Sequence, residues 1–296
     1  MATGSRICRN CRRMNSVDET QCHYCGAKFG GPVREQLFGV AGAFLGAGFP
    51  ATRVLVAVCI AVFAFCVLDH GGMPLGLSIL GQSKGFLPSE LLRWGALGLD
   101  YGSREPFRRL AAVFVHLGWL HLALNLMSMV DLGGHAERRF GSARFLILVV
   151  ISGYSGFWLS DAWYSWRYGA SPLTAGASGA IFGIVGGELG AMAVRRDPEL
   201  KDRFVRVVVY ALIFALVMPV NNAAHIGGFL AGAAFGALLE LQHRPQRLDK
   251  LFTALGVLAG LAALGSIVLS LRSPIWKEAR LRELEAAGLG EIRGDP

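Results

Sequence analysis

A serine and a histidine open two apolar, glycine-rich stretches of the chain. Ser178 lies in a Gly-Ala-Ser-Gly motif, and His225 lies in an Ala-His-Ile-Gly-Gly motif. A serine hydroxyl becomes a good nucleophile when a base takes its proton, and an imidazole can then return that proton to a leaving amine. Because ionisable groups are costly inside a bilayer, we interpret this pair as a candidate nucleophile and base within the membrane.

Evenly spaced glycines follow both candidate residues. They repeat every four positions, at Gly179, Gly183 and Gly187 after the serine and at Gly228, Gly232 and Gly236 after the histidine. Small residues at this spacing allow two membrane helices to approach closely. We predict that the two glycine faces pack together and bring the hydroxyl within reach of the imidazole, although glycines of this spacing taken alone indicate only helix packing.

His121 and Asn125 form a second polar pair in an apolar run. They lie four residues apart, so they share one face of a helix, and His116 precedes them by about a turn and a half. Both side chains can donate hydrogen bonds, as can the backbone N–H of Ser178. An acyl-transfer site needs such donors for the oxyanion of its tetrahedral intermediate. We therefore take His121 and Asn125 as candidate oxyanion residues.

The composition is that of a polytopic membrane protein. Of the 296 residues, 53% are apolar and 17% are charged, whereas soluble domains average about 45–50% and about 25%. The net charge of +8 is spread over short basic clusters between apolar runs, which favours contact with the bilayer and gives no reason to expect a nucleic-acid partner. Residues 1–20 hold no apolar segment of the kind that a cleavable signal peptide contains.

Seven apolar runs predict an all-α membrane domain over residues 51–271. The predicted spans are 51–68, 110–130, 144–161, 176–194, 204–219, 223–241 and 251–271. Lys and Arg concentrate in alternate short loops, so we predict a cytoplasmic N-terminus and an external C-terminus, as in a bacterial (inner) cell membrane. The long connection from Asp69 to Arg109 contains several leucines and Trp94, and we expect part of it to lie at the membrane interface.

The polar N-terminus, residues 1–30, carries four cysteines in two CxxC pairs. The pairs are Cys8 with Cys11 and Cys22 with Cys25. Four thiolates at this spacing predict a closed, structural zinc site, and the module resembles a zinc ribbon. A pair of disulfides is the alternative, but it conflicts with a reducing cytoplasm. A role in docking a cytoplasmic partner is a further hypothesis.

Two segments flank the membrane domain. Residues 31–50 form a Gly-rich linker that we expect to be an interfacial segment. Residues 272–296 form a polar tail with two readings: a frayed end, favoured by its mixed charges, or a short amphipathic helix, favoured by Ile275, Trp276, Ala279, Leu281, Leu284 and Leu289. Glu188 lies deep in the fourth run, where we expect it to pair with a polar group or to face the cytoplasmic cavity.

Four motifs in this order resemble the rhomboid family of intramembrane serine proteases. They are His116-x4-His121-x3-Asn125, Gly134-x2-Glu137-Arg138, Gly176-x-Ser178-Gly179 and Ala224-His225-x-Gly227-Gly228. The resemblance covers residues 51–271 and implies a six-helix core with, here, a seventh C-terminal span. Two positions depart from the family pattern: Phe107 precedes Arg108 where many members carry Trp, and Phe182 replaces a tyrosine that stacks on the histidine.

The resemblance implies an activity and a set of roles. Ser178 would be the nucleophile of a Ser-His dyad and His225 its general base and acid, while His121 and Asn125 would form the oxyanion site. His116, Gly176, Phe182, Glu137 and Arg138 would support them. The substrates would be transmembrane proteins, cut in or next to a membrane span. A catalytically silent relative that binds membrane proteins is the alternative; a transporter is disfavoured, because the sequence lacks internal repeats.

Overall fold

The computed structural model describes residues 5–7, 14–16, 19–26, 50–71, 85–98, 101–217, 220–242 and 248–288. These residues belong to two compact units, Met1–Gly48 and Phe49–Pro296. The predicted linker, residues 31–50, lies outside the described residues except for Pro50, where helix α2 begins.

The N-terminal unit contains a small antiparallel hairpin. Strand β1 (Ser5–Ile7) pairs with β2 (Met14–Ser16), and the buried Asn15 accepts a hydrogen bond from the N–H of His23 at 2.9 Å. Cys22 and Cys25 lie in the turn that follows, but Cys8 and Cys11 lie outside the described residues. The zinc site therefore stays a prediction.

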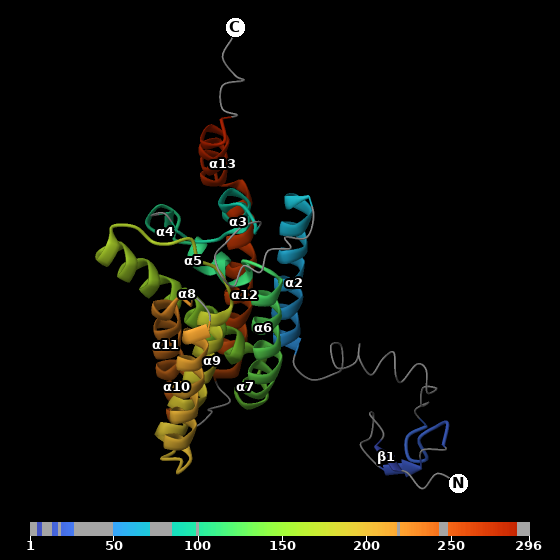
Figure 1. The fold of residues 1–296 in the computed structure, drawn as a ribbon. Coiled ribbons are helices and arrows are strands. Elements are labelled where there is room, and N and C mark those ends of the chain that lie inside the picture. The colour runs from blue at the N-terminus through green and yellow to red at the C-terminus, as the bar shows by residue number, and fades with distance from the viewer. Residues whose placement is uncertain are drawn as a thin grey trace. The chain divides into compact units, whose positions relative to one another are not determined.

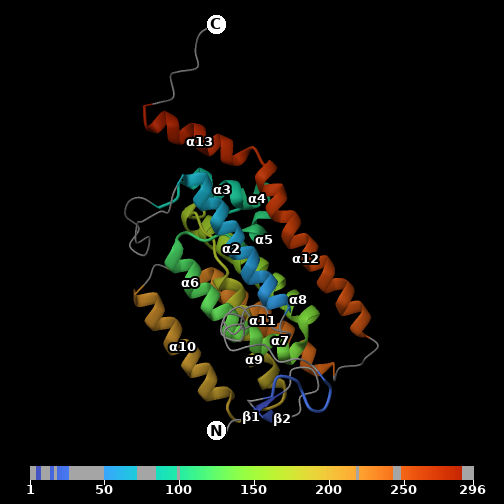
Figure 2. The same ribbon diagram turned by 90° about the vertical axis from the view of Figure 1, so that its right-hand side faces the viewer.

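The second unit is built from helices (Figures 1 and 2). In chain order they are α2 (Pro50–His70), α3 (Pro88–Trp94), α4 (Tyr101–Arg104), α5 (Arg108–Ala111), η2 (Ala112–Phe114), α6 (Trp119–Ser128), η3 (Met129–Gly133), α7 (Gly134–Phe140), α8 (Ser142–Tyr168), α9 (Ser178–Val194), α10 (Leu200–Val217), α11 (Asn222–Leu241), α12 (Asp249–Arg272) and α13 (Ile275–Ala286). The predicted all-α membrane architecture agrees with these helices.

Seven spans, however, are not confirmed. Within the described ranges, α2, α8, α11 and α12 are long and apolar enough to cross a bilayer, and the bent pair Arg108–Phe114 and Trp119–Phe140 would make a fifth span. The pair bends by 92°, because an extended segment interrupts the helix after Phe114. Helix α9 has only 17 residues, and α10 begins at Leu200 with four charged residues in its first two turns.

Helices α9 and α11 pack through their glycines, as predicted. A Cβ added at Gly228, Gly232 or Gly236 would meet the carbonyl oxygen of Gly179, Gly183 or Gly187, respectively. Because the partners advance together along both helices, α9 and α11 run in the same direction. This close contact places the first turns of the two helices, which carry Ser178 and His225, side by side.

Glu137 connects the end of the broken span, as we call the bent pair Arg108–Phe114 and Trp119–Phe140, to α2 and α8. Its carboxylate accepts hydrogen bonds from the N–H groups of Ala51 and Thr52, from the Thr52 hydroxyl at 2.6 Å, and from the Ser142 hydroxyl at 2.6 Å. The side chain is buried, so these four donors stabilise a charge that would otherwise be costly. Its part in the fold is structural.

The connection before the broken span and the C-terminal tail meet at one end of the unit. The first contains the short helices α3 and α4, with Leu92 and Tyr101 buried; the second contains α13, with Ile275 and Ala279 buried against them. Of the two readings of the tail, the short helix is the one found, over residues 275–286.

Candidate active site

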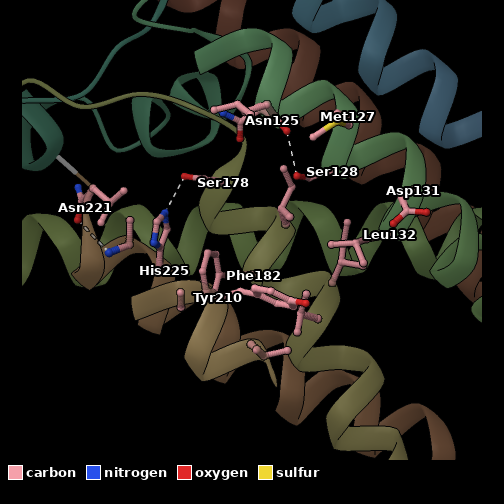
Figure 3. Close-up of a pocket in the computed structure, with 18 of the residues that line it drawn as sticks. Asn125, Met127, Ser128, Asp131, Leu132, Ser178, Phe182, Tyr210, Asn221 and His225 are labelled. Carbon is pink, nitrogen blue, oxygen red and sulfur yellow. Dashed lines mark hydrogen bonds between the residues drawn. The ribbon is translucent and has the colours of Figure 1, made fainter. Parts of the chain in front are cut away.

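Ser178 and His225 lie in direct contact. Ser178 is the first residue of α9, and His225 lies in the first turn of α11. The Nε2 atom of His225 is 2.9 Å from the Oγ atom of Ser178 (Figure 3). The sequence separates the two residues by 47 positions, and the glycine interface between their helices brings them together.

Phe182 packs against the face of the imidazole ring. It follows the serine by one helical turn, and its ring stacks on the His225 ring with 4.2 Å between centroids and 10° between planes. The stacked geometry needs an aromatic ring but no phenolic hydroxyl. The departure from tyrosine at this position therefore leaves the ring contact intact.

Asn221 fixes the start of α11 and was not singled out from the sequence. Its side-chain oxygen caps α11 by accepting a hydrogen bond at 3.0 Å from the N–H of Ala224, the residue before His225. Its Nδ2 atom donates to the hydroxyls of Ser160 at 2.7 Å and Thr174 at 3.0 Å. An asparagine just before an apolar helical run is an N-cap signal that could have identified it.

His121 faces the loop that leads to Ser178. The Leu117 N–H lies 3.4 Å from His121 Nδ1, so in the neutral ring the proton belongs on Nε2. Gly176 has φ +130°, and a Cβ added there would lie 2.8 Å from that Nε2 atom. Only a glycine fits this conformation and this close approach. The ring N–H of His121 is thus held next to Gly176, which precedes Ser178 by two residues.

Asn125 and His116 complete this group. Asn125 is buried, and its side-chain amide donates one hydrogen bond to the His121 carbonyl oxygen at 2.7 Å. The second hydrogen of that amide can donate to another acceptor. His116 is fully buried, with Nδ1 3.3 Å from the Phe114 carbonyl oxygen and its ring 5.3 Å from the ring of His121. His116 therefore packs behind His121 rather than beside the serine.

Ser178, His225, His121 and Asn125 line a cavity of about 1720 Å³. It extends between α6–η3, α9 and α10, and Figure 3 shows Met127, Ser128, Asp131 and Leu132 along one of its walls. The wall formed by α9 runs from Ser178 to Met192, roughly 21 Å at the helical rise of about 1.5 Å per residue. Most of this wall is apolar.

The far end of the cavity is charged. Glu188, whose role the sequence left open, pairs with Arg139 at 2.8 Å, and Arg139 also contacts Glu240 at 3.0 Å. Arg139 thereby joins α7 to both α9 and α11. Of the two expectations for Glu188, pairing and exposure to the cavity, the structure shows both.

Part of the chain is similar to a known protein family. Residues 103–242 match the Rhomboid domain family. This segment of the chain is therefore similar to a rhomboid domain. The matched rhomboid segment includes the broken span, α8, α9, α10 and α11, and hence every residue of the candidate site. The hairpin, α2, α3, α12 and α13 lie outside it. Together with the apolar helices, the domain identifies a multi-pass membrane protein.

Curated relatives are rhomboid proteins as well. The chain is 32% identical over 183 residues to the rhomboid protease GluP of Bacillus subtilis, covering 60% of this chain and 34% of that protein. It is 31% identical to rhomboid-like protease 3 of Toxoplasma gondii over 51% of this chain and 60% of the relative. RHOMBOID-like protein 4 of Arabidopsis thaliana is 36% identical over 47% and 35%. The chain thus spans less than two thirds of the length of each.

Proposed function

We propose that the protein is an intramembrane serine endopeptidase that hydrolyses peptide bonds in or next to transmembrane segments. The observation that carries the proposal is the 2.9 Å contact between Ser178 Oγ and His225 Nε2 inside a largely apolar cavity. A hydroxyl in contact with an imidazole is the arrangement that nucleophilic acyl transfer requires.

In the proposed reaction, Ser178 Oγ attacks the scissile carbonyl carbon while His225 Nε2 takes the hydroxyl proton. The carbonyl oxygen becomes an oxyanion, which the Ser178 N–H, His121 Nε2–H and the second Asn125 amide hydrogen stabilise. The C–N bond then breaks as His225 gives its proton to the leaving amine. Water then attacks the acyl-enzyme with His225 as base. Hydrolysis of the ester releases the second product and regenerates the Ser178 hydroxyl.

A dyad is favoured over a triad. Among the residues that the structure describes, the His225 ring makes no hydrogen bond to an Asp or Glu side chain. The ring is instead oriented by Phe182 and by its position on the capped end of α11. Stacking and helix geometry would then do the orienting that a third residue does in a triad.

The cavity also indicates the substrate class. Its apolar wall suits the side chains of a membrane span, while the reacting end near Ser178 is polar. A helix hides its carbonyl groups in its own hydrogen bonds, so the bound span would have to unwind locally before attack. Substrates with helix-weakening residues at the cut would therefore be preferred.

The first test is cleavage of a single-span reporter by the purified protein in liposomes, with product masses that locate the cut. A serine-directed fluorophosphonate probe is applied in parallel, and mass spectrometry identifies the labelled residue. We expect cleavage and labelling at Ser178. If cleavage fails but Ser178 is labelled, the reporter is the wrong substrate; if neither occurs, the silent, client-binding alternative replaces the protease.

Removal of an oxyanion donor should lower kcat far more than it changes KM. We expect His121→Ala and Asn125→Ala each to reduce kcat by about 10²- to 10³-fold, because these donors act mainly in the transition state. Steady-state kinetics on the same reporter measure the effect. A raised KM with an unchanged kcat would instead assign these side chains to substrate binding.

The zinc-ribbon module remains a proposal. Two features support it: the Cys22–Cys25 turn closes with a Gly26 N–H bond to the Cys22 carbonyl oxygen at 2.9 Å, and four thiolates suit a structural zinc ion. We expect about one zinc per chain in the purified protein and a loss of most of it in Cys22→Ser. Cys59→Ala, a change at a buried thiol of α2, is the matched control and should keep the metal.

The orientation with a cytoplasmic N-terminus, in a bacterial inner membrane, is also part of the proposal. It would put the module on the side where a docking partner is accessible. Deleting residues 1–30 should then slow the processing of native clients while leaving cleavage of the simple reporter unchanged.

A further inference from the structure

The C-terminal helix α13 docks on α3, outside the matched rhomboid domain. Ile275 and Ala279 on its inner face form a buried cluster with Leu92 of α3 and Tyr101 of α4. Figures 1 and 2 both show α13 next to α3, beyond the end of α12. This apolar contact sets the face of α13 that meets the rest of the unit.

One carboxylate fixes the docking geometry. Glu283 of α13 accepts two hydrogen bonds from Ser89 of α3, from its N–H at 2.8 Å and from its hydroxyl at 2.6 Å. Ser89 is buried and is the second residue of α3, where a backbone N–H has no acceptor within the helix. A two-point contact to a charged acceptor is strong and specific in direction.

A second connection runs from the start of the tail to the end of α3. The Ser273 hydroxyl lies 2.7 Å from Glu105 Oε1, and Glu105 accepts a hydrogen bond from Arg108 Nε at 2.6 Å. Arg108 is fully buried and donates from Nη1 to the carbonyl oxygens of Leu92, at 2.5 Å, and Ala96, at 3.3 Å. The C-terminal segment is therefore bonded directly to the start of α3 at Ser89 and is linked to its end through Glu105 and Arg108.

Leu97, just after α3, contacts a residue that supports the active site. Leu97 exchanges two backbone hydrogen bonds with Thr174, at 3.0 and 2.7 Å. The Thr174 hydroxyl accepts from Asn221, the residue that caps the helix of His225. Thr174 also precedes Ser178 by four residues. A displacement of the Leu97 backbone would thus reach the supports of both reacting groups.

We propose that α13 is a positioning element for the active site, which acts by docking Glu283 on Ser89 and so holding the α3–α5 segment against the loop before Ser178. The inference rests on the proposed protease function. Each step is a direct contact in the structure, and an experiment must measure the coupling along these contacts. Since 1 Å of misplacement can cost about 10²-fold in rate, a small displacement is sufficient.

The test uses the full-length protein in liposomes with Glu283→Ala, Glu283→Gln and the control Glu285→Ala. Glu285 is exposed on the same helix. We expect Glu283→Ala to slow fluorophosphonate labelling of Ser178, and kcat for the reporter, by at least about tenfold with KM changed less than about twofold. Glu283→Gln should recover most of the rate, because its amide can accept from the Ser89 N–H and donate to the Ser89 hydroxyl.

A second readout does not depend on catalysis. In the Ser178→Ala background, hydrogen exchange of the peptides that contain Leu97, Thr174 and Gly176 should rise with Glu283→Ala and stay constant with Glu285→Ala. Ser89→Ala, which removes one of the two hydrogen bonds, should give intermediate values and replaces Glu283→Ala if that variant does not fold.

Labelling of Glu283→Ala at the wild-type rate would overturn the inference, and so would unchanged exchange in these peptides. If the wild type itself is not labelled, the protease proposal fails, and the exchange measurement alone decides whether α13 holds the loop. The failures of the two proposals are therefore distinguishable.

Discussion

Ser178→Ala is expected to reduce cleavage of a membrane-spanning reporter by roughly 10⁴-fold or more, and His225→Ala by a similar factor. The hydroxyl is 2.9 Å from the imidazole, and each group is useless to the proposed reaction without the other. The double variant should consequently be no slower than either single variant, since residues that act as a unit have non-additive effects. Initial rates in liposomes measure all three.

The matched control for this prediction is Ser165→Ala. Ser165 lies on α8 and is not among the residues that line the cavity, so the same chemical change should leave the rate unchanged. Thermal unfolding in detergent checks that each variant is folded. Cleavage by Ser178→Ala at the wild-type rate, with the same product masses, would show that another nucleophile does the chemistry.

The contact between Ser178 and His225 was predictable because the sequence marks it twice. Each residue begins an apolar run, and each is followed by glycines at a spacing of four, so both the reacting groups and the interface that joins them are visible as patterns. The structure adds the register, in which Gly228 meets Gly179. Periodicity identifies a face but leaves its partner and register to be inferred.

Other features had no such signal. The break between Phe114 and Trp119 falls inside an apolar run, and hydropathy does not distinguish an extended apolar segment from a helical one. The Glu283–Ser89 contact joins residues 194 positions apart, one of them in a tail of mixed charge. Long-range polar pairs depend on the packed geometry, which local sequence patterns do not encode.

Gly232→Ala is expected to separate α9 from α11 and to slow cleavage strongly, although less than loss of a catalytic group does. A Cβ at this position would overlap the Gly183 carbonyl oxygen and lie 2.6 Å from the carbonyl carbon. Backbone cannot yield as a flexible side chain does, so the helices must move apart. We expect the free energy of unfolding to fall by about 1–3 kcal/mol and the cleavage rate to fall about 10²-fold.

Gly265→Ala provides the comparison that isolates the close approach as the cause. Gly265 lies on α12, and a Cβ there would meet no atom within 4 Å. The same added methyl group in a helix interior should stabilise by about 0.5–1 kcal/mol, because alanine loses less conformational freedom than glycine on folding. Thermal unfolding and Ser178 labelling at a temperature where both variants are folded separate the two effects. If Gly232→Ala labels as fast as Gly265→Ala, the glycine interface does not set the distance between serine and histidine; slow labelling of a folded Gly232→Ala means that it does.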